Sequence, residues 1–213
     1  KPRKIWFDDT VQRLNVDGRG ELLGEFRAED KLLIVHQSGK AKAVTPNLAS
    51  RFEDDMIVLE KWKPKKPLSA VYFDGEKERY YVKRFLIENI DKDELIISEH
   101  PKSKLEIIAT DYRPMAEVIF SKRSLDKLTI NFEEFIAVKG IKAQGNQLTS
   151  DKIKQVNLLD SLPYDEPEEI TSEEIEVIEE EVLSEETLPL EITNLEKLPE
   201  KPVLISSDEK AKK

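Results

Sequence analysis

Leu32-Leu-Ile-Val-His-Gln-Ser-Gly-Lys-Ala-Lys-Ala-Val44 is the stretch of sequence that decides the fold. Its first half is an apolar run, and its second half alternates small apolar residues with Lys. Between them lies Ser38-Gly39, a pair suited to a tight turn because Gly adopts positive φ without steric cost. Runs of this kind on either side of a turn predict a β-hairpin.

Three further hairpin-like segments follow, over residues 68–82, 105–120 and 135–148. The four segments therefore begin at residues 32, 68, 105 and 135. Asp74-Gly75 provides the turn of the second segment, and Tyr112-Arg113-Pro114 provides the turn of the third. The sequence thus predicts four β-hairpins in a row.

Each predicted hairpin is followed by a further short strand, at residues 55–59, 93–97, 126–130 and 154–158. The result is four units of at least three strands, repeated at about 35 residues, which is typical of blade-built architectures. A unit of this size cannot bury its own apolar face, so we expect the units to pack on one another. The alternative is an ordinary barrel or sandwich whose strands merely look alike.

Charge divides the chain into a body and a tail. Residues 1–158 carry 29 Lys+Arg and 26 Asp+Glu, a net charge of +3, whereas residues 159–213 carry 5 and 18, a net charge of −13. The two sum to the −10 of the whole chain. The tail is rich in Glu and Pro and has too little apolar surface to offset chain entropy. We therefore predict a domain over residues 1–160 and a disordered acidic tail over residues 161–213.

One segment of the tail is a possible exception to disorder. Thr171-Ser-Glu-Glu174 resembles a capping box, and Ile175, Ile178 and Val182 would share one face of a helix. A solvated acidic run with incidental spacing is the alternative interpretation.

Composition excludes several classes of function. The chain has no Cys, which excludes disulfides, thiolate metal sites and a Cys nucleophile, and which suits a reducing cytoplasm. No apolar run approaches the roughly 18 residues that span a membrane. Because strand-like sequence begins almost at once after Lys1, with no initiating Met, we expect the chain to be a piece of a longer polypeptide.

No catalytic, metal or cofactor site is predicted. His36 and His100 are too few and too isolated for a metal cluster or a proton relay, so we expect structural or surface roles for both. Asp91-Lys-Asp-Glu94 lacks the Gly and the distant Glu of a calcium loop and is interpreted as a polar turn. No stretch resembles a Gly-rich phosphate loop.

A family resemblance enters with the last predicted unit. Residues 134–159, together with 3–15 and 33–42, resemble the carboxy-terminal domain of the topoisomerase IV A subunit of Bacteroidetes-type bacteria, and the likeness covers residues 3–160. The resemblance implies a β-pinwheel of four-stranded blades, with duplex DNA along a basic rim. It also places the strand-breaking tyrosine in an upstream domain. With only four recognisable units, we expect an open, broken pinwheel.

The resemblance also implies partners and excludes one relative. The remainder of the A subunit, as a homodimer, and the topoisomerase B subunit would be the protein partners, and ATP and Mg²⁺ would bind elsewhere in the parent complex. The motif Gln-Arg-Arg-Gly-Gly-Lys-Gly, by which the gyrase A subunit wraps DNA, is absent from the sequence. A gyrase-type wrapping domain is therefore disfavoured.

Sequence-independent DNA binding requires Lys and Arg side chains spaced to neutralise successive phosphates. The densest run is 61–66, where Pro64 favours an extended loop and Trp62 can anchor the loop against a blade. The candidate DNA-binding residues are Lys40, Lys42, Lys61, Lys63, Lys65, Lys66, Arg79, Lys83, Arg84, Lys102, Lys104, Arg113, Lys122, Arg123, Lys139 and Lys142. Alternatively, these charges merely occupy the solvent faces of the strands.

The sequence therefore predicts a non-catalytic DNA-binding module of a cytoplasmic, nucleoid-associated topoisomerase that supports DNA relaxation and decatenation. A propeller-like protein-interaction scaffold is the alternative. The acidic tail either competes with DNA for the basic rim or is a solubilising extension.

Overall fold

The computed structural model describes residues 1–167, 177 and 180–184. Residues Lys1–Asp165 form one compact unit. Most of the predicted tail, including most of the possible helix over 171–182, lies outside the described residues, although residues 177 and 180–184 are helical. In the part of the chain that the structure describes, no helix is long and apolar enough to cross a membrane.

The first unit is built almost entirely of strands. In chain order they are β1 (Arg3–Asp8), β2 (Arg13–Asn15), β3 (Glu21–Phe26), β4 (Leu32–His36), β5 (Lys40–Val44), β6 (Met56–Lys61), β7 (Leu68–Asp74), β8 (Arg79–Phe85), β9 (Glu94–Leu95), β10 (Lys104–Ala109), β11 (Met115–Phe120), β12 (Leu128–Asn131), β13 (Asn146–Thr149) and β14 (Ile153–Leu159). One short helix, α1 (Phe132–Phe135), follows β12.

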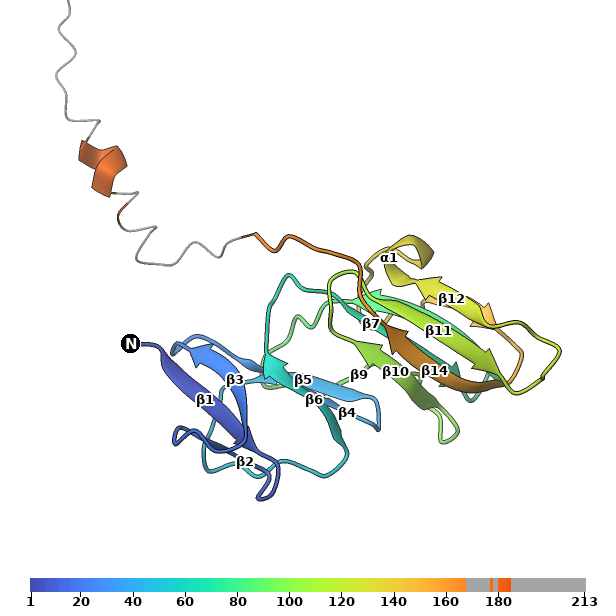
Figure 1. The fold of residues 1–213 in the computed structure, drawn as a ribbon, viewed down its shortest axis with the longest axis horizontal. Helices are drawn as coiled ribbons and strands as arrows, with labels where there is room; N and C mark the ends of the chain where they lie inside the picture. Colours follow the sequence, from blue (N-terminus) through green and yellow to red (C-terminus); the bar gives the residue numbers. More distant parts are fainter. Residues whose placement is uncertain (168–176, 178–179, 185–213) are drawn as a thin grey trace, which may run out of the picture. The chain divides into compact units, whose positions relative to one another are not determined.

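The strands form four antiparallel sheets (Figure 1). Sheet 1 has the strand order β2-β1-β3, sheet 2 has β6-β4-β5-β9, sheet 3 has β10-β7-β8-β13 and sheet 4 has β12-β11-β14. The prediction of an all-β fold made of repeated multi-stranded units is confirmed.

All four sheets contain a hairpin and a returning strand, and in sheets 2 and 3 a strand from the next unit along the chain completes the sheet. A hairpin (β1–β2, β4–β5, β7–β8 or β11–β12) is flanked by a returning strand (β3, β6, β10 or β14) beside its first strand. A crossing segment from the next unit lies beside the second strand: β9 pairs with β5, and β13 pairs with β8. In sheet 1 the crossing segment is reduced to one antiparallel bridge between Arg13 and Arg51.

This exchange corrects the predicted third hairpin over 105–120. Its two strands exist, but β10 pairs with β7 in sheet 3 and β11 pairs with β12 and β14 in sheet 4. The segment at Tyr112-Arg113-Pro114 is thus a link between sheets rather than a hairpin turn. Strand periodicity gave the existence of the strands but not their partners.

The predicted fourth hairpin over 135–148 is also wrong. Asn131 caps a helical turn, α1, by accepting a hydrogen bond from the Glu134 N–H, and this turn ends at Phe135, where the first strand of the hairpin was expected to begin. Only β13 of the predicted segment is a strand, and it pairs with β8 as the crossing segment of sheet 3.

The glycines of the two predicted turns, Gly39 and Gly75, are required for different physical reasons. Gly39 has φ +87°, as expected. Gly75 is not among the glycines with positive φ; a side chain there would instead clash with His100 and Lys102. The positive φ of this turn falls on Glu78, at +53°.

The hydrophobic cores lie between successive sheets, as expected for units too small to bury their own faces. Ile5, Leu14 and Phe26 of sheet 1 pack with Leu32 of sheet 2. On the other face of β4, Leu33 and Val35 pack against sheet 3. Sheet 3 in turn packs through Val71 and Val82 against Val118 and Ile130 of sheet 4. Strands of sheets 2 and 3 are therefore buried on both faces.

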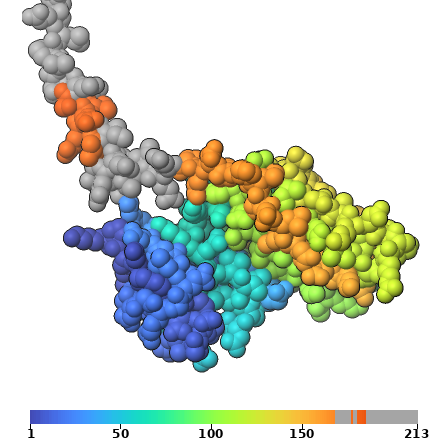
Figure 2. Space-filling model, viewed as in Figure 1, coloured from blue at the N-terminus to red at the C-terminus, as the bar shows by residue number. Residues whose placement is uncertain are grey.

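The row of sheets is open at its ends. No hydrophobic cluster among the described residues joins sheet 1 to sheet 4. Figure 2 shows successive parts of the domain as adjoining bands, from blue in sheet 1 to yellow and orange in sheet 4. The architecture is the broken β-pinwheel that the sequence predicts.

The chain after β14 is held against the domain. Leu162 N–H donates to the Arg113 carbonyl at 2.9 Å, and the Ser161 hydroxyl donates to Asp111 at 2.6 Å. The rings of Tyr112 and Tyr164 stack with centroids 4.0 Å apart. Residues 161–164, which the sequence assigned to the tail, thus pack on the link between β10 and β11.

Candidate nucleic-acid interface

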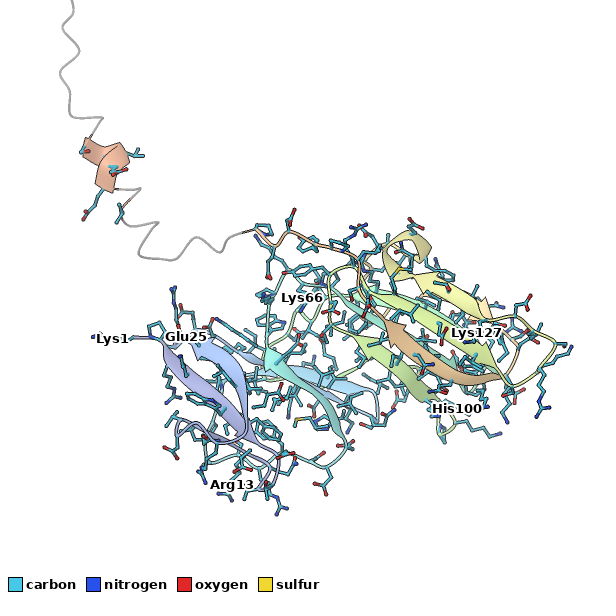
Figure 3. All side chains as sticks on the ribbon, in the orientation of Figure 1. Lys1, Arg13, Glu25, Lys66, His100 and Lys127 are labelled. Atoms are coloured by element: carbon cyan, nitrogen blue, oxygen red, sulfur yellow. The ribbon has the colours of Figure 1, made fainter. Side chains whose placement is uncertain are left out.

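A basic residue recurs at the hairpin turn of every sheet. Arg13, Lys40 and Arg79 are the first residues of β2, β5 and β8, and Lys127 directly precedes β12. The four positions are equivalent because each opens the second strand of its hairpin. In Figure 1 the arrows of β1 and β11, the first strands of the hairpins of sheets 1 and 4, point toward the lower right, so the turns that follow these two strands lie on that side of the picture. We name the four residues Arg13, Lys40, Arg79 and Lys127 the turn row; Figure 3 labels Arg13 in sheet 1 and Lys127 in sheet 4.

The turn row is exposed to solvent at all four positions. Arg79 donates to the Lys77 carbonyl and to the Gln147 side chain, at 3.3 and 3.2 Å. Lys127 lies 3.6 Å from Glu117, in a pair whose Lys side chain is 65% exposed. Surface pairs of this kind are weak and exchange readily with other anions, so these cations remain available to phosphates.

The turn that presents Arg79 is rigid. The Asp74 side chain accepts hydrogen bonds from the backbone N–H groups of Glu76 and Lys77 and from the Gln144 side chain. Burial favours the neutral form of Asp74, but these hydrogen bonds outweigh it and lower the pKa. Asp74 therefore stays ionised and fixes the turn at neutral pH.

The run 61–66 is anchored as predicted, because Trp62 packs against the core between sheets 2 and 3. Its lysines are largely committed to neighbours. Lys61 pairs with Asp30 at 2.9 Å, and Lys66 lies 3.6 Å from Glu60 and 5.5 Å from the centroid of the Tyr112 ring. Lys65 is exposed. The densest basic run of the sequence is therefore not the most accessible positive surface.

Lys83 is a structural residue. Its side chain is 4% exposed and donates to the carbonyl of Ile96 at 2.6 Å and to the carbonyl of Ile141. Ile96 follows β9 and Ile141 precedes β13, so one ammonium holds both crossing segments to β8. Burial lowers the pKa of Lys83 to about 8. Lys83 cannot reach a phosphate from this position.

Arg84 also faces the interior. It is 8% exposed, and its guanidinium donates to the Tyr112 carbonyl at 2.5 Å, while its Nε has no hydrogen-bond partner. Burial lowers its pKa, and the nearby carboxylate of Glu133 opposes this shift. We therefore leave Lys83 and Arg84 out of the candidate interface.

The remaining candidates are scattered over loops and strand ends. Lys42 lies 3.5 Å from Asp93, Lys104 lies 3.6 Å from Glu106, and Arg113 pairs with Glu133 at 2.6 Å. The hydrogen bond from Arg113 lowers the pKa of Glu133. The exposed residues of this set are Lys102, Lys104, Lys122, Arg123, Lys139 and Lys142, while Lys63 is half-buried. Lys122 and Arg123 belong to the turn between β11 and β12 and thus extend the turn row.

Sequence reasoning missed Arg13, Arg19, Arg51 and Lys127. Arg13 and Lys127 could have been found by aligning the hairpins on their second strands, because each occupies the place of Lys40 and Arg79. Arg51 could not have been found in this way, because only the tertiary structure brings it alongside Arg13 in β2. Arg13, Arg19 and Arg51 together line a cleft at the turn end of sheet 1.

The two histidines make local contacts. His36 Nδ1 lies 2.7 Å from Asp55 and 3.8 Å from Glu53, which ties the end of β4 to the segment before β6. His100 Nδ1 accepts from the Lys102 N–H at 3.1 Å. The structural or surface roles expected for these residues stay predictions, and His36 is less isolated than expected, because its ring nitrogen and the Glu53 and Asp55 carboxylates lie within 4.8 Å of one another.

Comparisons with known proteins place the chain in a family. A comparison with curated proteins found no match. Among solved structures, the chain is similar to the "Structure of the E. coli ParC C-terminal domain" at 15% identity and a TM-score of 0.44, covering 75% of this chain and 82% of that chain. This overlap is loose, and the assignment rests instead on the family model "Topoisomerase C-terminal domain, Bacteroidota", which matches residues 13–160. The chain belongs to the topoisomerase C-terminal domain family of Bacteroidota.

Proposed function

We propose that this domain binds duplex DNA through its phosphate backbone, without reading the base sequence, as the non-catalytic carboxy-terminal domain of a topoisomerase IV A subunit. DNA breakage and ATP hydrolysis belong to other domains and to the B subunit in this proposal. The domain contributes by holding DNA segments near the enzyme during relaxation and decatenation. Its place is with the nucleoid in the bacterial cytoplasm.

The turn row is the observation that carries the proposal. A polyanion requires cations that repeat along a surface, and the repeat of the fold supplies one at each successive hairpin turn, at Arg13, Lys40, Arg79 and Lys127. Backbone contacts of this kind position DNA without specifying its sequence. The open row of sheets presents this surface without requiring a closed ring.

Neutralising the turn row tests the proposal. In the variant Arg13→Gln, Lys40→Gln, Arg79→Gln, three cations at hairpin turns are lost, so the slope of log affinity against log salt should become shallower by about 2–3. The measurement is fluorescence anisotropy of a labelled duplex over a series of salt concentrations. Affinity at low salt should fall with the slope.

The matched control removes the same charge from the other ends of the hairpins. Arg3 and Lys4 open β1, and Lys31 directly precedes β4, and none of these positions is in the turn row. The variant Arg3→Gln, Lys4→Gln, Lys31→Gln should keep most of the salt slope. If both variants lost the same salt slope and affinity, the loss would be explained by net charge alone, and the turn row would not be the DNA-binding surface. A wild-type chain without DNA affinity at low salt would instead favour a protein-interaction scaffold.

A further inference from the structure

A cleft of about 630 Å³ opens at the turn end of sheet 1. Its polar lining comprises Asp8, Thr10, Arg13, Asn15, Arg19 and Arg51. In sheets 2 and 3 the corresponding edge of the hairpin is covered by a crossing strand, β9 or β13. In sheet 1 only the bridge at Arg51 takes this position, so the edge of β2 stays open and the cleft forms there.

Two arginines of this cleft face each other directly. Arg13 and Arg51 are partners in an antiparallel bridge, and partners in such a bridge project their side chains from the same face. Both side chains are exposed, and no ion pair to either is found among residues 1–167. Like charges in this arrangement repel each other unless an anion lies between them.

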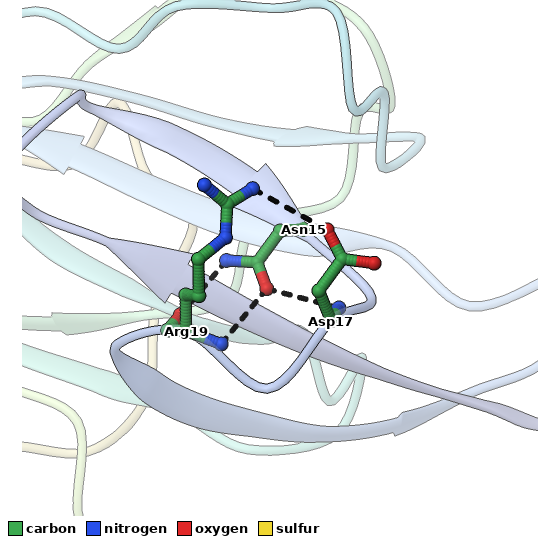
Figure 4. A network of polar contacts seen from close by, with 3 residues as sticks. All are labelled: Asn15, Asp17 and Arg19. Atoms are coloured by element: carbon green, nitrogen blue, oxygen red, sulfur yellow. Dashed lines mark hydrogen bonds and ion pairs between the residues drawn. The ribbon is translucent and has the colours of Figure 1, made fainter.

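The loop that carries the third arginine is held in shape (Figure 4). The Asn15 side chain is buried, with 5% of the residue exposed; its Oδ1 accepts from the N–H groups of Asp17 and Arg19, and its Nδ2 donates to the Arg19 carbonyl at 2.8 Å. Gly20 closes the loop with φ +83°, at a place where any side chain would clash with the Phe7 carbonyl. The backbone of Arg19 is therefore fixed beside the cleft.

The charge balance of the cleft is positive. Three guanidinium groups line it, with Asp8 as the one carboxylate. The Asp8 Oδ1 atom is occupied by a hydrogen bond from the Thr10 N–H at 3.0 Å. Asp17 pairs with Arg19 at 3.3 Å, but both side chains are more than 60% exposed, at 68% and 62%. This pair is therefore too weak to neutralise the cleft.

We propose that this cleft is a phosphate-binding site in which Arg13 and Arg51 share one phosphate group and Arg19 lies beside it. Guanidinium groups suit this ligand because their planar donors match two oxygens of a phosphate at once. Under the proposed function, the phosphate belongs to the backbone of a duplex that follows the turn row, and sheet 1 grips it more tightly than the single cations of the other sheets.

The variant Arg51→Gln tests the site, with Arg3→Gln at the far end of β1 as the matched control. In wild-type protein, inorganic phosphate should raise the melting temperature above that in chloride of equal ionic strength, by about 2–4 °C near saturation. Arg51→Gln should abolish this gain, and Arg3→Gln should keep it. Arg13→Gln should behave as Arg51→Gln does, which guards against an effect peculiar to one variant.

Duplex DNA distinguishes the source of the phosphate. If the ligand is the DNA backbone, Arg51→Gln should make the salt slope of DNA binding shallower by about 1, while Arg3→Gln leaves it unchanged. If phosphate raised the melting temperature of the wild-type protein but the protein did not bind DNA, the cleft would be a site for free phosphate. That result would overturn the proposed function and leave the phosphate site standing. An equal phosphate response in wild type and Arg51→Gln would overturn the cleft, whatever the DNA result.

Discussion

In sheet 3 the crossing segment is a full strand, β13, whereas in sheet 1 it is the single bridge between Arg13 and Arg51. Lys83 of sheet 3 is buried and bonded to two backbone carbonyls, and Arg13 of sheet 1 is exposed in a cleft. Sheet 3 thus buries a cation that bonds its own crossing segment and that of sheet 2, whereas sheet 1, which lacks a crossing strand, leaves Arg13 exposed at an open edge.

Truncation of core aromatics should give the largest difference between the two sheets. Phe85 in sheet 3 is 0% exposed and Phe26 in sheet 1 is 2% exposed. Removing either ring should cost about 3–5 kcal/mol of unfolding free energy, with Phe85→Ala at the upper end because sheet 3 is packed on both faces and cannot collapse into the cavity. Chemical denaturation at constant m-value measures this. A larger cost for Phe26→Ala would contradict the view of sheet 1 as the looser end.

Glycine substitutions should probe the loop that holds Arg19. Gly18 and Gly20 both have positive φ, but a side chain at Gly18 meets nothing, and one at Gly20 meets the Phe7 carbonyl. Gly18→Ala should cost about 1–2 kcal/mol from backbone conformation alone, and Gly20→Ala should cost more because the clash adds to it. Thermal unfolding of the two variants makes the comparison, and equal melting temperatures would argue against the tight loop.

Alkaline pH should reveal the buried ammonium of sheet 3. The pKa of Lys83 is about 8 in the folded domain and about 10.4 in an unfolded chain. Between these values the unfolded chain binds more protons, so stability should rise with pH, by about 2 kcal/mol from pH 7.5 to 9.5. Burial raises the pKa of Tyr72, which acts in the opposite direction only above pH 10.

The variant Lys83→Met removes this titration. Its stability should lack the rise above pH 8, and it should be lower near neutral pH because the Ile96 and Ile141 carbonyls lose their donor. Urea denaturation at several pH values provides the measurement. The exposed residue Lys40 gives the control, since Lys40→Met should leave the pH profile of wild-type protein intact. A rise that persists in Lys83→Met would assign it to another group.

The sequence predicted strands well and their partners poorly. The hairpins at 32–44 and 68–82 form as expected, because each needs only a local turn between two alternating runs. The segments at 105–120 and 135–148 fail because β10, β11 and β13 find their partners in different sheets. Strand periodicity does not indicate with which distant strand a given strand pairs.

For the candidate interface, the sequence supplied the residue types but not their orientation. Lys40 and Arg79 emerged as candidates and lie in the turn row, yet Lys83 and Arg84 had the same appearance and are buried. Alternation of polar and apolar residues along a strand places the polar residues in solvent only when one face of the sheet is exposed. Sheet 3 has no such face, because sheets 2 and 4 cover both of its faces.

By itself, then, the sequence determined the all-β class, the repeat of short units and the division between a mildly basic body and an acidic tail. These properties depend on local alternation and composition, which a linear chain records directly. Tertiary structure alone decided that strands cross between sheets, that Lys83 turns inward and that Arg51 meets Arg13. Those outcomes depend on which surfaces are buried from water when the sheets stack, and this burial is determined jointly by residues that are far apart in the chain.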